Sequence, residues 1–215
     1  MKPHLNYLFF RQLSRLILFP LVRFRYAGTE NIPKTGPVIL VSNHQSYMDP
    51  VLIGCANPRK PVVYMARESL FRWAPFAWFL GQMHVFPVKR GGADRSAWRH
   101  FEKLVADGEQ VNFYPEGTRS PDGKLQPANP GAGMLIHRCK GAVVIPVRVR
   151  GAYKVLNKDR GFSGLHPVSL VYGPPVDVSA EMAAEGGRET YQALADKVMA
   201  AIAAIGPIDG KDDDL

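Results

Sequence analysis

Residues 38–49 read VILVSNHQSYMD, and this stretch sets the first expectation for the fold. The apolar, mostly β-branched run at residues 38–41 is typical of a buried strand. The polar residues that follow place His44 where the strand gives way to a loop, the edge at which open α/β sheets collect their ligands. If the chain after this loop forms a helix, Asp49 can accept a hydrogen bond from one ring nitrogen of His44 and leave the other as a proton acceptor. The alternative is that His44 is only a tolerated polar residue at a strand end.

The rest of the chain alternates short apolar runs with helical patterns, which favours an α/β fold. We expect one domain with a mostly buried mixed sheet flanked by helices. Pro146 suggests a strand end or an edge, because proline lacks the N–H that a central ladder needs. Strands are predicted at residues 38–41, 61–65, 85–88, 111–114, 143–149 and 169–172, and helices at residues 94–106 and 191–205.

Composition and charge limit the classes of protein and partner. A length of 215 residues with 46% hydrophobic and 21% charged residues suits one globular domain. The net charge of +8 predicts an anionic partner, such as nucleic acid, an anionic membrane or a phosphorylated substrate. The two cysteines are far apart and form no C-x-x-C pair, which favours a reducing compartment.

The N-terminal segment, residues 1–26, is basic and amphipathic. Arg11 and Arg15 interrupt its apolar stretch and Pro20 would kink it, so we expect neither a transmembrane helix nor a cleaved signal. The pattern predicts a helix at the membrane interface whose cations meet anionic headgroups. The alternative is a helix packed on the protein core with snorkelling arginines. The apolar residues at helical spacing are Leu5, Leu8, Phe9, Leu13, Leu16 and Ile17.

Three further segments carry candidate chemistry. YPEGTRS, residues 114–120, follows a predicted strand and presents Thr118 and Arg119, while Gly117 would let backbone N–H groups approach an anion. An ordinary surface turn is the alternative. VFPVKRGG, residues 85–92, ends in two cations that a solvated turn would also explain. VIPVRVRG, residues 144–151, is by itself structural.

The four segments, in this order, resemble the signature of the glycerolipid acyltransferases. The resemblance is to the 1-acylglycerol-3-phosphate acyltransferases, also called lysophosphatidic acid acyltransferases, and it covers about two thirds of the chain. Tyr114 stands where Phe is commoner, a difference for which we expect no functional consequence. The chain would then comprise a membrane-associating helical segment at 1–26, an acyltransferase domain at 27–206 and a disordered acidic tail at 207–215.

The resemblance implies a role for each matched residue. His44 would be the general base that takes the proton of the acceptor hydroxyl, and Asp49 would orient it; the hydroxyl would attack an acyl thioester directly. Arg90 and Arg119 would bind the acceptor phosphate. The remaining acceptor-binding residues would be Glu116, Gly117 and Thr118, and Val144, Ile145 and Pro146 would line the acyl-donor side.

The implied partners are a phospholipid membrane surface, a lysophospholipid acceptor and acyl-CoA or acyl carrier protein as co-substrate. The expected location is peripheral, at the cytoplasmic face of the membrane. We expect no metal, no cofactor and no nucleic acid, because the histidines show no metal-ligand spacing and no nucleic-acid motif accompanies the charge. A thioesterase or hydrolase in which His44 activates water stays open, as does a non-catalytic membrane-binding module. Residues 71–83 could be core, acyl groove or membrane-facing rim.

Overall fold

A seven-stranded sheet organises the chain, with the strand order β1-β9-β6-β2-β5-β3-β4. All neighbouring pairs are parallel except β6 and β9. The computed structural model describes residues 5–59, 61–89, 94–157, 159 and 161–210. The strands are β1 (Arg25–Ala27), β2 (Val38–Ser42), β3 (Val63–Arg67), β4 (Val85–Val88), β5 (Gln110–Phe113), β6 (Val143–Arg150) and β9 (Ser169–Tyr172), and β7 (Leu156–Asn157) pairs with β8 (Gly161–Phe162) in a separate hairpin.

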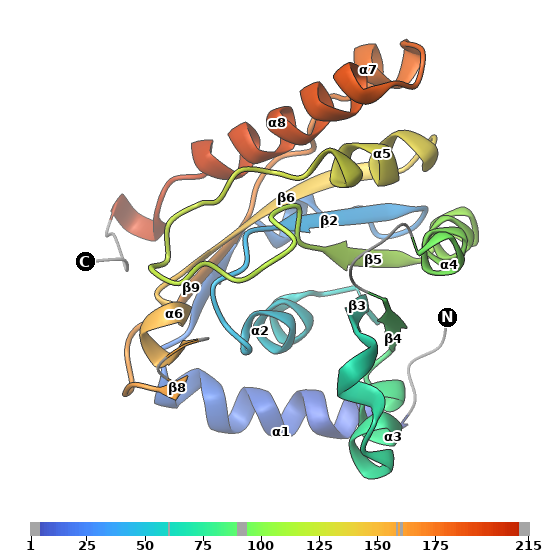
Figure 1. Ribbon diagram of the computed structural model, residues 1–215. Coiled ribbons are helices and arrows are strands. Elements are labelled where there is room, and N and C mark those ends of the chain that lie inside the picture. The colour runs from blue at the N-terminus through green and yellow to red at the C-terminus, as the bar shows by residue number, and fades with distance from the viewer. Residues whose placement is uncertain (1–4, 60, 90–93, 158, 160, 211–215) are drawn as a thin grey trace.

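Helices cover both faces of the sheet (Figure 1), which confirms the predicted mixed α/β fold. One side carries α1 (Leu5–Leu21) and α2 (Asp49–Ala56), and the opposite side carries α5 (Pro130–Arg138) and α8 (Arg188–Ala204). The remaining helices are α3 (Ala74–Gln82), α4 (Arg95–Ala106), α6 (Ala152–Val155) and α7 (Ser179–Ala183). Short 3₁₀ turns lie at η1 (Thr29–Asn31), η2 (Glu68–Phe71) and η3 (Ile208–Gly210), and residues 211–215 of the predicted tail lie outside the described residues.

The central strand β2 divides the core into two layers. Val38 and Leu40 pack in the layer that contains α2, while Ile39 and Val41 pack with α4, α5 and α8. This is the alternation that a strand buried on both faces requires. β5 and β6 flank β2 in parallel, so the chain leaves all three strands at one edge of the sheet.

Pro146 lies inside an inner strand, so the expectation of a strand end or an edge is wrong for β6 as a whole. The ladder with β9 begins only at Val147, which pairs with Tyr172. The carbonyl of Pro146 accepts from Gly173 N–H at 2.8 Å, on the side of β6 towards the chain just beyond β9. The N–H that proline lacks would point to the same side. Proline therefore removes no hydrogen bond from the ladder.

Helix α1 lies with its apolar stripe outward. Leu5, Phe9 and Leu16 are 81, 61 and 75% exposed, whereas Arg11 is 6% exposed. Arg11 donates to the carbonyls of Gly54, Cys55 and Asn57 at 3.1, 2.9 and 2.9 Å. The expectation that Arg11 meets lipid headgroups is thus wrong, because its charge is used at the negative end of the α2 dipole.

Helix α3 extends the outward apolar surface. None of its residues is buried, and Trp73 and Trp78 are 68 and 57% exposed, so residues 71–83 are not core. It packs on α1 through an edge-to-face contact of Phe10 with Phe79, 5.1 Å between ring centres. Within the described residues, no helix has the length and hydropathy that crossing a bilayer requires.

Candidate active site

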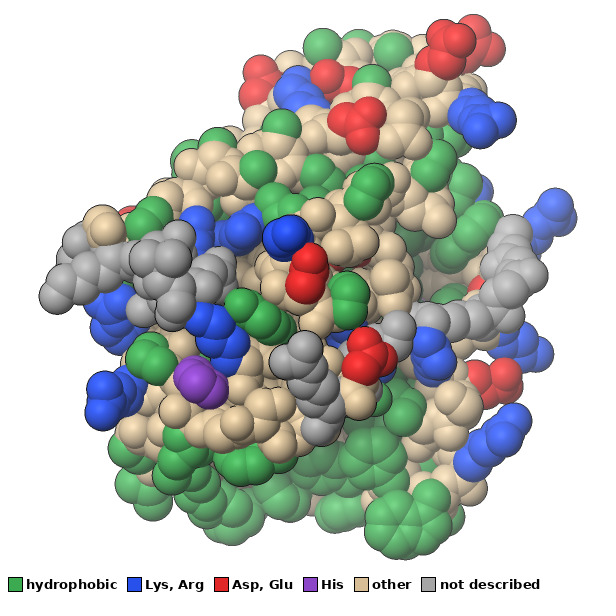
Figure 2. Space-filling model, turned by 60° about the vertical axis from the view of Figure 1, so that its left-hand side comes forward, with side chains coloured by type: hydrophobic (Ala, Val, Ile, Leu, Met, Phe, Trp, Pro, Cys, Tyr) green, Lys and Arg blue, Asp and Glu red, His purple; other side chains and the backbone are tan. Residues whose placement is uncertain are grey.

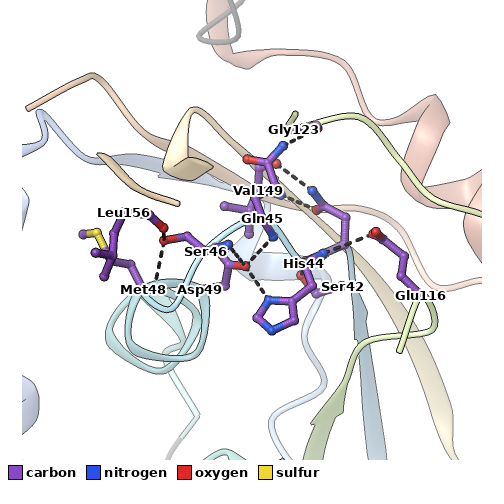
Figure 3. A network of polar contacts seen from close by, with 11 residues as sticks. Ser42, His44, Gln45, Ser46, Met48, Asp49, Glu116, Gly123, Val149 and Leu156 are labelled. Atoms are coloured by element: carbon purple, nitrogen blue, oxygen red, sulfur yellow. Dashed lines mark hydrogen bonds and ion pairs between the residues drawn. The ribbon is translucent and has the colours of Figure 1, made fainter. Parts of the chain in front are cut away.

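The two residues of the predicted pair are in direct contact. His44 lies in the loop after β2, and its Nδ1 is 2.7 Å from Asp49 Oδ2 (Figure 3). The same oxygen accepts the backbone N–H groups of Gln45 and Ser46 at 2.7 and 2.8 Å. An oxygen that accepts two backbone hydrogen bonds acts as an acceptor towards the ring as well, so we place the imidazole proton on Nδ1 and the free lone pair on Nε2.

Local structure explains how Asp49 reaches back to His44. Asp49 is the first residue of α2 and Pro50 the second, and proline is favoured at a helix start because it needs no intrahelical N–H partner. A carboxylate at this position is stabilised by the positive end of the helix dipole. Asp49 is fully buried, while the His44 side chain keeps 19% exposure. The carboxylate of Asp49 is therefore fixed and shielded from water, whereas solvent or substrate can reach the imidazole of His44.

The YPEGTRS segment contacts both the backbone and the ring of His44. Glu116 Oε1 accepts the backbone N–H of His44 at 3.1 Å, and Ser120 donates its N–H to the His44 carbonyl at 2.8 Å. Tyr114 stacks on the imidazole with 3.8 Å between ring centres and 12° between planes. These contacts fix the backbone and the ring plane of His44, and the role of Tyr114 in them was missed by the sequence analysis.

Glu116 has an unusual electrostatic environment. It is 8% exposed, and its burial raises the pKa of the carboxyl from the ordinary 4.5 to about 7. The hydrogen bond from His44 N–H opposes this rise, and the nearby negative charge of Asp49 adds to it. Near neutral pH the carboxyl can thus be uncharged, which lowers its repulsion of an approaching anion.

Three more side chains of the NHQSYMD segment bind backbone groups that are distant in the sequence. The sequence analysis gave these side chains no role. Asn43 exchanges two hydrogen bonds with the backbone of Val149 in β6, at 2.9 and 2.8 Å. Gln45 donates to the Gly123 carbonyl at 2.7 Å, and Ser46 Oγ donates to the Leu156 carbonyl at 2.8 Å (Figure 3). The polar residues around His44 therefore connect β2, β6 and the loop after β5.

Arg119 is held by a ring rather than by a carboxylate. Its guanidinium carbon lies 3.5 Å from the centre of the Tyr47 ring, and Tyr47 is 52% exposed. Among the described residues no hydrogen bond or ion pair occupies its N–H groups. A stacked guanidinium presents its N–H edge sideways, the geometry in which an arginine pairs with two oxygens of a phosphate.

Gly117 and Thr118 complete the turn before Arg119. Gly117 has a left-handed backbone, with φ of 67°, which explains the glycine. Its own N–H donates to the Tyr114 carbonyl at 3.1 Å, so this N–H serves the turn rather than an anion. Thr118 is half-buried beside it.

The remaining predicted residues are Arg90 and three residues of β6. Arg90 lies outside the described residues. Its neighbour Lys89 follows β4, two strands from β5, and strands about 4.8 Å apart place the ends of β4 and β5 roughly 10 Å from each other. Val144, Ile145 and Pro146 are buried in β6, Val144 facing one core layer and Ile145 the other. No cluster of three or more potential metal ligands occurs in the described part of the chain.

Comparisons with known proteins place this chain in a family context. The sequence profile of a family described as "Acyltransferase" matches residues 23–150. A chloroplastic 1-acyl-sn-glycerol-3-phosphate acyltransferase of Brassica napus is 31% identical over 66% of this chain and 42% of its own length. The 1-acyl-sn-glycerol-3-phosphate acyltransferase of Streptococcus pneumoniae is 27% identical over 80% of this chain and 63% of its own length.

A solved structure shares the fold. The crystal structure of the 1-acyl-sn-glycerophosphate (LPA) acyltransferase PlsC from Thermotoga maritima superposes with a TM-score of 0.71 and 25% identity. The match covers 92% of this chain and 78% of the solved one. The chain thus spans about two fifths to two thirds of the two curated relatives named above and most of this structural one.

Proposed function

We propose that this chain, which belongs to the acyltransferase family, transfers an acyl chain from a thioester to the free hydroxyl of 1-acylglycerol-3-phosphate, giving phosphatidic acid. The observation that carries the proposal is the 2.7 Å contact between His44 and the buried Asp49, which leaves Nε2 of a partly exposed imidazole as a proton acceptor. The acceptor is proposed from the activity for which the relatives are named and from the stacked guanidinium of Arg119.

The chemistry needs one proton acceptor and one electrophile. His44 Nε2 takes the proton of the acceptor hydroxyl while the oxygen attacks the thioester carbonyl carbon. Collapse of the tetrahedral intermediate breaks the C–S bond, and the leaving thiolate takes the proton back from the imidazolium. Asp49 stabilises the imidazolium between these steps, as the carboxylate of a catalytic triad does.

Acceptor recognition falls to Arg119 and its neighbours. Its always-charged fork suits a phosphate monoester, and Tyr47 keeps the guanidinium plane in place. The raised pKa of Glu116 lets that carboxyl remain uncharged near a phosphate. Acyl-CoA or acyl carrier protein is the proposed donor, and a donor-side role for residues 144–146 stays a prediction.

We also propose peripheral attachment at the cytoplasmic face of a membrane. The outward apolar residues of α1 and the exposed tryptophans at the start of α3 and within it lie at one end of the molecule, where Figure 2 shows hydrophobic side chains gathered. Burying such a surface in the interface between headgroups and acyl chains would remove it from water. The acceptor lipid would then be met at the surface in which it resides.

The test is a grid of donors and acceptors with the purified chain, read by mass spectrometry of products. Acyl-CoA and acyl carrier protein are each combined with lysophosphatidic acid, with a monoacylglycerol and with no acceptor. Phosphatidic acid is expected, and His44→Ala should lower its formation by about 10²–10⁴-fold. Release of free fatty acid without acceptor, at the rate seen with lysophosphatidic acid, would instead identify a thioesterase in which His44 activates water.

A further inference from the structure

A cleft of about 470 Å³ lies at the C-terminal end of α1, away from the residues around His44. Its walls come from two segments that are far apart in sequence, the end of α1 and the chain between β8 and β9. The lining residues are Pro20, Leu21, Arg23, Leu165, His166 and Pro167. None of them belongs to the NHQSYMD or YPEGTRS segments.

The backbone at Arg23 is in an unfavourable conformation. α1 ends in the helix-capping arrangement in which Phe24 N–H donates to the Phe19 carbonyl at 2.8 Å and Arg23 N–H to the Pro20 carbonyl at 3.3 Å. In this arrangement the residue at the position of Arg23 is left-handed and is usually glycine. Arg23 has φ of 45° there. A non-glycine residue in this conformation motivates a hypothesis of function, which the neighbouring groups have to support.

The polar groups of the cleft are available to a ligand. Among the described residues, neither the Arg23 guanidinium nor the His166 ring takes part in a hydrogen bond or an ion pair. An arginine offers a planar fork of N–H donors that fits phosphate oxygens, and either ring form of histidine offers at least one more N–H. The site therefore has the donors for a phosphate and no described acidic residue in its lining to repel one.

Exposed apolar side chains lie in and near the lining of the cleft. Leu21 and Leu165 in its rim are 46 and 54% exposed, and Phe162 nearby in sequence is 66% exposed. Figure 2, which brings this end of the molecule forward, shows a hydrophobic lower surface with Lys, Arg and His side chains just above it. If the apolar rim enters the acyl region, Arg23 and His166 are at the depth of the phosphates.

We propose that this cleft binds the phosphate of an anionic membrane phospholipid, as an anchoring site separate from the acceptor site at His44. The inference rests on the peripheral attachment proposed above and adds a defined lipid class and two residues to it. Arg23 pairs with the phosphate oxygens, His166 donates a further N–H, and the leucines contact the first carbons of the acyl chains. The lipid comes from the bilayer, not from solution.

The experiment compares retention of the full chain on vesicles of phosphatidylcholine alone and of phosphatidylcholine with phosphatidylglycerol. Arg23→Gly removes the charge and at the same time relieves the left-handed backbone, so its thermal midpoint should equal or exceed that of the wild type. Arg23→Lys keeps the charge without the fork. His166→Ala removes the ring and its N–H donors, and Arg188→Gln removes one exposed charge at the start of α8 as a matched control.

Arg23→Gly should bind phosphatidylglycerol vesicles at least about fivefold more weakly, the loss expected for one cation at a charged surface, and phosphatidylcholine vesicles as the wild type does. The binding of Arg23→Lys and of His166→Ala should lie between these values, and that of Arg188→Gln should be unchanged. The proposal is overturned if Arg23→Gly loses no more vesicle binding than Arg188→Gln, or if it loses binding equally on both kinds of vesicle. It is also overturned if millimolar inorganic phosphate fully releases the wild type from the vesicles, because the cleft would then be a site for free phosphate.

Acyl transfer to lysophosphatidic acid dispersed in detergent separates the two proposals. Arg23→Gly should keep wild-type turnover there, because the cleft lies outside the catalytic residues. If the wild type does not transfer the acyl chain, this result counts against the proposed function. The vesicle binding then decides by itself whether the cleft binds lipid.

Discussion

Glu116→Gln tests the claim that a buried carboxyl lies beside the base. The amide keeps the size of the side chain and an oxygen that can accept the N–H of His44, but it cannot ionise. Burial raises the pKa of Glu116 from 4.5 to about 7 in the folded chain, whereas the unfolded chain ionises near the ordinary value. Between these two pH values the folded state therefore binds more protons than the unfolded state.

The sign and size of the effect follow from proton linkage. Because the folded carboxyl keeps its proton longer, the Glu116 contribution to stability is fully present below about pH 4.5 and is lost as the pH rises to about 7. At about 1.4 kcal/mol per pH unit, the loss amounts to about 3 kcal/mol. The free energy of unfolding of Glu116→Gln, minus that of the wild type, should rise by this amount across the interval and be constant above it.

Urea titrations followed by circular dichroism, at several pH values on both sides of this interval, measure the difference directly. Subtraction removes the other titrating groups, which the two proteins share. Glu185→Gln, which removes a carboxyl of the same type at an exposed position before α8, is the matched control. A flat difference curve for Glu116→Gln would refute the reasoning, since it would mean that the Glu116 carboxyl ionises as it does in the unfolded chain.

His44→Ala is expected to lower acyl transfer by about 10²–10⁴-fold with an unchanged circular dichroism spectrum, and near-normal turnover would remove His44 as the base. In steady-state assays Arg119→Ala should raise the acceptor KM more than it lowers kcat, and Arg119→Lys should recover part of the loss. A collapse of kcat with an intact preference for the phosphorylated acceptor would contradict this prediction. Tyr47→Leu should raise the same KM while Tyr47→Phe should not, because phenylalanine keeps a ring under the guanidinium, and equal effects of the two would argue against stacking. Arg11→Met should lower the free energy of unfolding in urea by about 1–3 kcal/mol, because three carbonyls at the end of α2 lose their donor; an unchanged midpoint would show that water replaces it.

The elements with local causes could be read from the sequence. β2 was predicted within one residue, because its apolar run is bounded by polar residues and needs no knowledge of the partner strands. The contact of His44 with Asp49 was predicted because the two residues lie on either side of a helix start. The first strand residue of β3 was placed two residues early, and β1, β7 and β8 were not foreseen, since strands of two or three residues carry little periodic signal.

The surroundings of the pair depended on tertiary structure. Asn43 meets Val149, and Gln45 meets Gly123, across separations of 106 and 78 residues that no local pattern encodes. Arg119 and Tyr47 come together only because β2 and β5 are neighbours in the sheet. The raised pKa of Glu116 likewise arises from the burial of its carboxyl, which depends on the tertiary packing and not on the local sequence.

Helix α1 shows the division most clearly. Its periodicity determined that the helix has an apolar and a polar side, because the 3.6-residue repeat is a property of the helix alone. Which side faces the protein was decided by packing: the carbonyls at the end of α2 accept from Arg11, and this turns Leu5, Phe9 and Leu16 outward. Amphipathicity is encoded within five turns of one helix, whereas its orientation depends on a hydrogen-bond acceptor that lies more than forty residues away in the chain.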